Sequence, residues 1–159
     1  MPIHRNSATQ KEKFIAFQRA YRSILLYQES ENFIAAYVLA FSVLEDRIKA
    51  MYVVGFLDKH QRPPKQDQID QGFLKLTSKL KHINYINLDF YNKLYDEALK
   101  RNELLHSTLW NADAFTSEAV NSLLVLVKES DRLLKKKKRE ISFQTKSFPE
   151  NYDDSTCKP

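Results

Sequence analysis

The sequence predicts an all-α protein, a bundle of about five helices, and three observations support this fold class. Glycine and proline are scarce, with 2 and 5 among 159 residues, whereas a β-sandwich or barrel needs many tight turns. The hydrophobic content of 43% and the charged content of 28% are those of an ordinary globular protein. Apolar residues recur at helical spacing over most of the chain. At this length we expect one domain, residues 1–139, and a flexible polar tail, residues 140–159.

The individual helices are expected where apolar residues return every three or four positions. They cover about residues 9–27, 31–54, 68–81, 89–107 and 116–139. Ser30 is the expected N-cap of the second helix, and Gly55 is its expected stop signal. Pro63 and Pro64 keep the polar loop after it out of helix. The stretch "INYINLDF" is expected to connect the third helix to the fourth.

The positive charge is concentrated near the end of the last helix. The run from Lys135 to Arg139 carries as much positive charge as the whole chain has net, +5. Such a run is usually a solvated helix end, where cations also suit the negative end of the helix dipole. Contact with phosphate groups, of a nucleic acid or at a membrane surface, is the alternative.

A cytoplasmic location is the simplest expectation for this chain. No apolar run approaches the length of a membrane span, and the N-terminus "MPIHRNSATQKEK" lacks the apolar region of a signal peptide. The one cysteine, Cys157, lies in the polar tail and has no partner for an intramolecular disulfide. We therefore expect no membrane partner.

The fourth helix contains polar residues where leucines would be expected. Its apolar stripe is formed by Tyr91, Leu94, Tyr95, Ala98 and Leu105. Arg101 follows Leu94 by seven residues, and Asn102 and His106 follow Ala98 by four and eight, so all three are expected to share the core-facing direction. A guanidinium pointing inward costs several kcal/mol unless it is paired or opens onto a cleft.

Two explanations of the inward arginine remain open at this stage. Glu45 also interrupts an apolar stripe, four residues past Phe41 on the second helix, so Arg101 and Glu45 could form an internal salt bridge. Alternatively, Arg101 faces a cleft that holds an anion. The four histidines share no metal-ligand spacing, and no glycine-rich phosphate loop is present, so neither a metal nor a cofactor is expected.

The segment "RNELLH" resembles the R-x4-6-H signature of the HEPN superfamily of helical proteins. Arg101 and His106 stand at the signature positions, and Asn102 supplies the polar residue that the family prefers directly after the arginine. The stretch "AAYVLAFSVLEDRIKAMY" also resembles the long helix of these domains, with an acidic residue in its middle. The resemblance covers about residues 9–135 in architecture and a few residues in detail.

This resemblance implies a metal-independent endoribonuclease that acts as a homodimer, with the motifs of two protomers forming one cleft. His106 would transfer protons, Arg101 would stabilise charge on the phosphoryl oxygens, and Asn102 would orient the imidazole or hold the phosphate. Attack by the RNA 2′-hydroxyl would leave a 2′,3′-cyclic phosphate and a 5′-hydroxyl. Lys100 and Ser107 are the expected further substrate contacts.

The same resemblance implies a toxin or antiviral-defence effector, with an antitoxin or regulatory protein as a further partner and Glu45 in a supporting role. A toxin branch of the family has a tyrosine two residues after the histidine, where its antitoxin modifies it. Thr108 stands there in this chain. The alternative to the nuclease is a non-catalytic helical module that binds a protein or RNA, with Arg101 in a structural ion pair.

Overall fold

Six α-helices and one short 3-10 helix form the part of the chain that the computed structural model describes, residues 9–107 and 110–144. The helices are α1 (Gln10–Glu29), α2 (Phe33–His60), α3 (Gln66–Ile69), α4 (Phe73–His82), α5 (Leu88–His106), η1 (Ala112–Ala114) and α6 (Ser117–Gln144). No strand occurs within these residues. The predicted all-α bundle is therefore confirmed.

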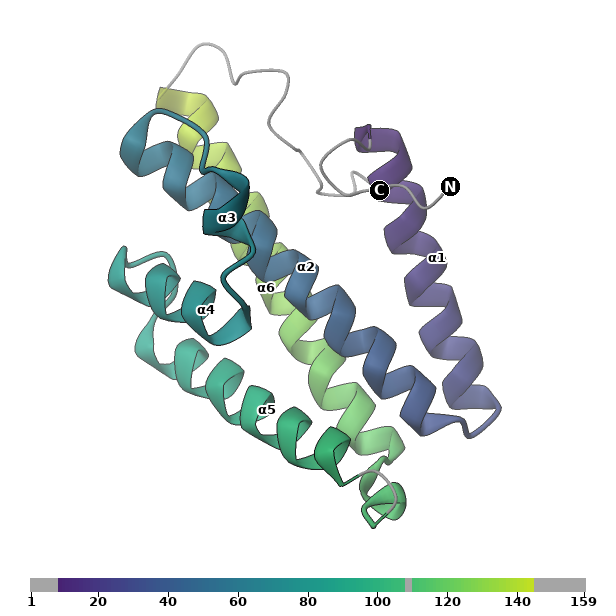
Figure 1. Ribbon diagram of the computed structural model, residues 1–159. Helices are drawn as coiled ribbons and strands as arrows, with labels where there is room; N and C mark the ends of the chain where they lie inside the picture. The colour runs from purple at the N-terminus through teal and green to yellow at the C-terminus, as the bar shows by residue number, and fades with distance from the viewer. Residues whose placement is uncertain (1–8, 108–109, 145–159) are drawn as a thin grey trace.

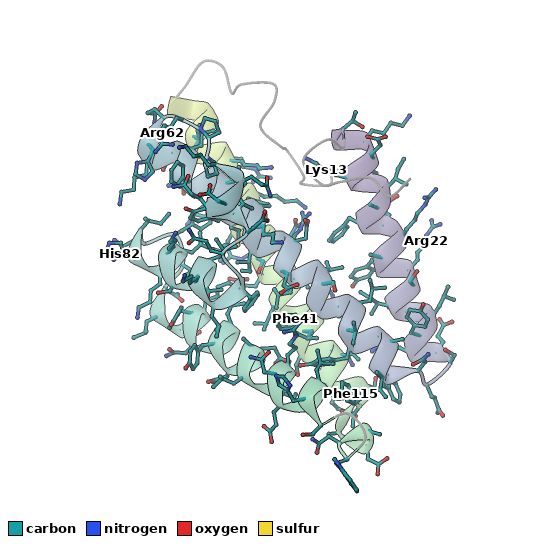
Figure 2. The ribbon with its side chains drawn as sticks, in the orientation of Figure 1. Lys13, Arg22, Phe41, Arg62, His82 and Phe115 are labelled. Carbon is teal, nitrogen blue, oxygen red and sulfur yellow. The ribbon has the colours of Figure 1, made fainter. Side chains whose placement is uncertain are left out.

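The two longest helices, α2 and α6, lie side by side through the middle of the bundle (Figure 1). Helix α1 packs on one side of α2, while α4 and α5 form a layer on the other side. The core between these helices is almost entirely aliphatic and aromatic, because the helices around α2 turn apolar faces toward it and α2 itself is buried on several sides. In Figure 2, Phe41 of α2 points into this core, and His82 and Phe115 lie near opposite ends of the α4–α5 layer.

Side chains that cap the exposed amides fix where the helices begin. Thr9 and Glu12 form a reciprocal capping box at the start of α1. The Asn87 side chain accepts a hydrogen bond of 2.8 Å from the Phe90 amide at the start of α5. The prediction of Ser30 as the N-cap of α2 was wrong, because Asn32 caps that helix.

Gly55 does not end α2, and the prediction that it would is wrong. The helix continues through Gly55 to His60, and the glycine is needed for close packing. A Cβ atom at position 55 would stand 2.8 Å from both Ile83 Cδ1 and Tyr85 Cδ2. The α4–α5 connection can therefore lie directly against the backbone of α2 only because this position has no side chain.

The predicted third helix, residues 68–81, is divided into α3 and α4. Gly72 causes the break, because its φ of 89° lies in the left-handed region that an α-helix cannot include. At the other end of the chain, α6 runs beyond the predicted domain boundary at residue 139 to Gln144, and Ile141 is buried. The remainder of the predicted tail, residues 145–159, lies outside the described residues. No helix in the described segments has the length and apolarity needed to cross a bilayer.

Candidate functional site

The predicted site residues lie in the last two turns of α5 and directly after it. Arg101, Asn102 and Lys100 are half-buried, His106 is exposed in the last turn, and Ser107 ends the helix. Thr108 lies outside the described residues. The site thus occupies one end of the bundle, at the connection between α5 and α6.

His106 does not share the core-facing direction that was predicted for it. Tyr95 is 40% exposed, and His106 follows it by eleven residues, which returns to within about 20° of the same direction. Arg101 and His106 are five residues apart, or about 140° around the helix. The predicted stripe therefore combined two faces, one packed on the core through Leu94 and Ala98 and one exposed through Tyr95.

Arg101 is held by an aromatic ring and an amide. Its guanidinium carbon lies 5.0 Å from the centre of the Phe41 ring of α2, and its Nη1 donates a hydrogen bond of 3.1 Å to Asn102 Oδ1. Within residues 9–107 and 110–144, no carboxylate oxygen lies within 4.0 Å of this guanidinium. The expected ion pair with Glu45, one turn beyond Phe41, is therefore not formed.

A buried hydrogen bond that the sequence did not reveal lies beside Arg101. The hydroxyl of Tyr37 on α2 donates to Glu97 Oε1 on α5 at 2.9 Å, and both side chains are buried. Phe115 packs edge-on against the Tyr37 ring, with centroids 5.4 Å apart. Burial raises the pKa of the Tyr37 phenol, and the charge and hydrogen bond of Glu97 raise it further, while the charge of Arg101 opposes them. Tyr37 therefore stays a neutral donor.

Together these contacts make a polar cluster between α2 and α5, with Glu97 one turn before Arg101 on the same helix. Sequence analysis missed Glu97, although one signal could have found it, namely a carboxylate three residues after Leu94 on the buried face. Its partner Tyr37 could not be found in this way, because the pairing depends on how α2 packs against α5. The cluster fixes the backbone from which Arg101 projects.

The deeply buried charge of α2 is Arg47 instead of Glu45. Arg47 is only 2% exposed and forms ion pairs with Asp46 at 2.7 Å and with Asp131 of α6 at 3.6 Å. Its guanidinium also lies 5.0 Å from the ring centre of Phe17 on α1. Because it links three helices, Arg47 is a structural residue.

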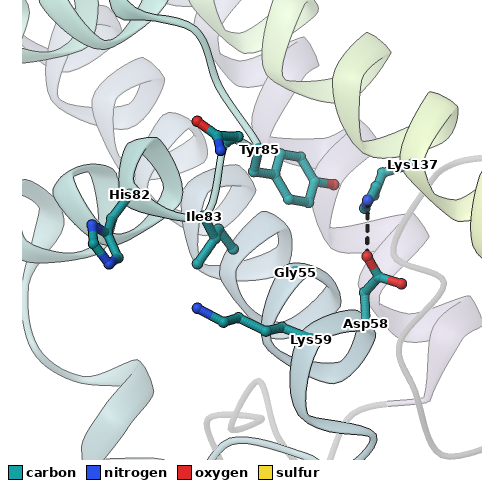
Figure 3. A pocket seen from close by; sticks show the side chains of 8 residues that line it. Gly55, Asp58, Lys59, His82, Ile83, Tyr85 and Lys137 are labelled. Atoms are coloured by element: carbon teal, nitrogen blue, oxygen red, sulfur yellow. Dashed lines mark ion pairs between the residues drawn. The ribbon is translucent and has the colours of Figure 1, made fainter.

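A cleft of ≈ 330 Å³ opens at the other end of the bundle, over Gly55. Figure 3 shows Tyr85 and Ile83 above it and the ion pair of Lys137 with Asp58, 2.9 Å long. The Tyr85 hydroxyl is inaccessible and has no hydrogen-bond partner within the described part of the chain. Burial raises the pKa of this phenol, and the charges of Glu140 and Asp58 add to the effect.

The basic run belongs in part to the packed bundle. Lys135 pairs with Asp131 at 3.0 Å, and Lys137 pairs with Asp58 of α2. Residues 135–139 are helical, as predicted, since α6 continues past them. These ion pairs give Lys135 and Lys137 partners inside the protein.

Among the described residues, no group of three His, Cys, Asp or Glu side chains gathers as a metal site would require. Comparisons with models of protein families, with curated proteins and with solved structures found no match.

Proposed function

We propose that this protein is a metal-independent endoribonuclease of the HEPN type, with Arg101, Asn102 and His106 at its active site. One observation carries the proposal: Arg101 is half-buried and positioned by Phe41 and Asn102, and no carboxylate within the described residues forms an ion pair with it. A guanidinium held in this way keeps its planar donors for an anion, and a phosphodiester fits them well.

The chemistry needs a base, an acid and a cation, because RNA supplies its own nucleophile. A base removes the proton of the 2′-hydroxyl while its oxygen attacks the adjacent phosphorus. The bond from phosphorus to the 5′-oxygen breaks, and that oxygen takes a proton from an acid. The products are a 2′,3′-cyclic phosphate and a 5′-hydroxyl. His106 serves as the proton-transfer group, and Arg101 stabilises the charge on the phosphoryl oxygens.

The active unit in this proposal is a homodimer. Leu88, Tyr95 and Leu99 are 58%, 40% and 48% exposed, and with His106 they lie within about 20° of one direction around α5. An exposed apolar strip of this kind is typical of a protein interface. When it pairs with the same strip of a second copy, the two His106 side chains approach a shared cleft.

The biological setting that we propose is a toxin or antiviral-defence system, following the HEPN resemblance of the segment from Arg101 to His106. Such an enzyme would need a restraining partner, an antitoxin or regulatory protein. Lys100 and Ser107, both half-buried beside the motif, are the proposed further contacts to RNA. Glu45, one turn from Phe41 on α2, would act only indirectly.

The test is RNA cleavage in EDTA by the wild-type protein and by His106→Ala and Arg101→Ala. We expect cleavage by the wild type and a loss of at least about 100-fold in each variant, since proton transfer and charge stabilisation each contribute that much. His82→Ala is the matched control, because His82 is also exposed in the last turn of a helix.

Cleavage by His106→Ala at the wild-type rate would refute the proposal, as would an inactive, folded wild-type dimer. The second candidate function is a non-catalytic binding module, which the exposed strip of α5 also favours. That protein would leave RNA intact, and Leu99→Asp would abolish its binding to a partner, whereas His106→Ala would not.

A further inference from the structure

Trp110 is the one tryptophan of the chain, and its side chain is 86% exposed. The backbone places it beside the end of α5. The amides of Trp110 and Asn111 both donate hydrogen bonds to the Ser107 carbonyl, at 2.9 and 2.8 Å. The backbone of Trp110 therefore lies beside Ser107, the residue that follows His106 of the proposed active site.

The exposed indole of Trp110 offers a large apolar surface for recognition. An indole has the largest apolar surface of any side chain, and leaving it in water forgoes the free energy of burying that surface. Tyr37 and Phe115, two aromatic side chains at this end of the bundle, are buried. Exposed aromatic rings beside a nucleic-acid site commonly stack on bases.

We infer that Trp110 stacks on an unpaired nucleobase next to the cleaved phosphodiester, so that the substrate is single-stranded RNA. This inference rests on the proposed ribonuclease function. A duplex covers both faces of each internal base, so an indole can stack only where a nucleotide is unpaired.

The charges of the segment after Trp110 and of the α1–α2 turn favour a base over a phosphate as the contact of Trp110. The segment that follows it lines a cleft of ≈ 620 Å³ together with the α1–α2 turn, and Glu31, Asp113 and Glu118 are among the lining residues. These carboxylates repel phosphates, whereas a base is neutral. The phosphodiester would then lie toward Arg101, with the base toward the loop.

The chain offers a direct measurement, because all tryptophan fluorescence comes from this residue. Wild-type protein is titrated with a single-stranded oligonucleotide that carries 2′-O-methyl groups and cannot be cleaved. We expect strong quenching on binding. The same sequence in a hairpin stem, or with abasic sites, should quench little at equal occupancy, which fluorescence anisotropy of a labelled oligonucleotide determines.

A second arm measures cleavage. Trp110→Ala should lower kcat/KM for single-stranded RNA by roughly tenfold and Trp110→Phe by less, because a smaller ring still stacks. Tyr27→Ala is the matched aromatic control, because Tyr27 is also exposed, at 38%, but belongs to α1 and not to the proposed site. This control should leave both kcat/KM and the quenching by the oligonucleotide unchanged.

Three outcomes would overturn the inference. The first two are equal quenching by single-stranded and duplex oligonucleotides, and an unchanged kcat/KM in Trp110→Ala. The third is a change of Trp110 fluorescence when the protein is diluted without RNA, which would assign Trp110 to an interface between copies. Failure of the proposed function looks different. In that case wild-type protein cleaves no RNA, whatever the fluorescence of Trp110 does.

Discussion

The hydroxyl of Tyr37 donates a hydrogen bond to the Glu97 carboxylate, 2.9 Å away, and so ties α2 to α5 one turn before Arg101. The bond is buried, so it is not weakened by competition with water. Arg101 in turn stacks on Phe41, which belongs to α2 like Tyr37. The position of Arg101 therefore depends on the neighbouring hydrogen bond between Tyr37 and Glu97.

Tyr37→Phe should destabilise the protein by about 1–3 kcal/mol, because it leaves the buried Glu97 carboxylate without its donor. Tyr85→Phe is the matched control, since that hydroxyl is buried without a partner among the described residues. Its removal should leave the free energy of unfolding unchanged or raise it by up to about 1 kcal/mol. Urea unfolding measures both values, and equal destabilisation by the two variants would contradict this interpretation.

The two inward arginines should behave in opposite ways. Arg47→Ala removes a buried cation that links α1, α2 and α6, and it should lower the free energy of unfolding by about 3–5 kcal/mol. Arg101→Ala removes a stacking contact from a half-buried site and should cost about 1 kcal/mol or less. Its main effect should be on RNA cleavage. If Arg101→Ala unfolds the protein as Arg47→Ala does, Arg101 is structural.

Gly55→Ala should destabilise the bundle by about 1–3 kcal/mol, because the new Cβ meets Ile83 and Tyr85 at 2.8 Å. The double variant Gly55→Ala, Ile83→Val should recover part of that loss, since valine lacks the Cδ1 atom in the contact. Thermal unfolding followed by circular dichroism measures both. A fully stable single variant would show that the α4–α5 connection moves away without cost.

Leu99→Asp should convert the proposed dimer to a monomer that stays folded, because Leu99 is already 48% exposed within one copy. Val125→Asp is the control. Val125 is 64% exposed on α6, one turn after Asn121, which accepts a hydrogen bond from Gln28 of α1 and so faces away from α5. Sedimentation velocity distinguishes the two variants, and a monomeric wild-type protein would contradict the shared cleft.

The sequence predicted the helices well because an apolar residue every three or four positions is a local signal. The prediction failed at positions where contacts between helices far apart in the sequence determine burial and available space. Glu45 and Arg47 are two residues apart on α2 and therefore point about 160° apart around the helix, toward opposite flanks. Arg47 is buried, because α1 and α6 pack against its side of α2, and the sequence of α2 does not reveal this packing. The prediction for Gly55 failed for the same reason, since the need for space at that position comes from Ile83.

The sequence motif named candidate residues for the site, but it did not predict their geometry. The motif located Arg101, Asn102 and His106, because it depends on spacing alone. The predicted core-facing direction of these three residues was based in part on Tyr95. An apolar pattern assigns Tyr95 to the interior, although its side chain is exposed. The contacts of Arg101 could not be predicted from the sequence. Only the packing of α2 against α5 places its guanidinium against the Phe41 ring and the Asn102 amide, and not against Glu45.

The most direct test of the ribonuclease proposal uses an oligonucleotide that is DNA except for one ribose, incubated in EDTA, with its product ends identified by mass spectrometry. We predict one cut, directly after the ribose, that leaves a 2′,3′-cyclic phosphate and a 5′-hydroxyl, and no cut by His106→Ala. Cleavage at deoxynucleotides, 5′-phosphate ends, or an unchanged cut by His106→Ala would contradict the account.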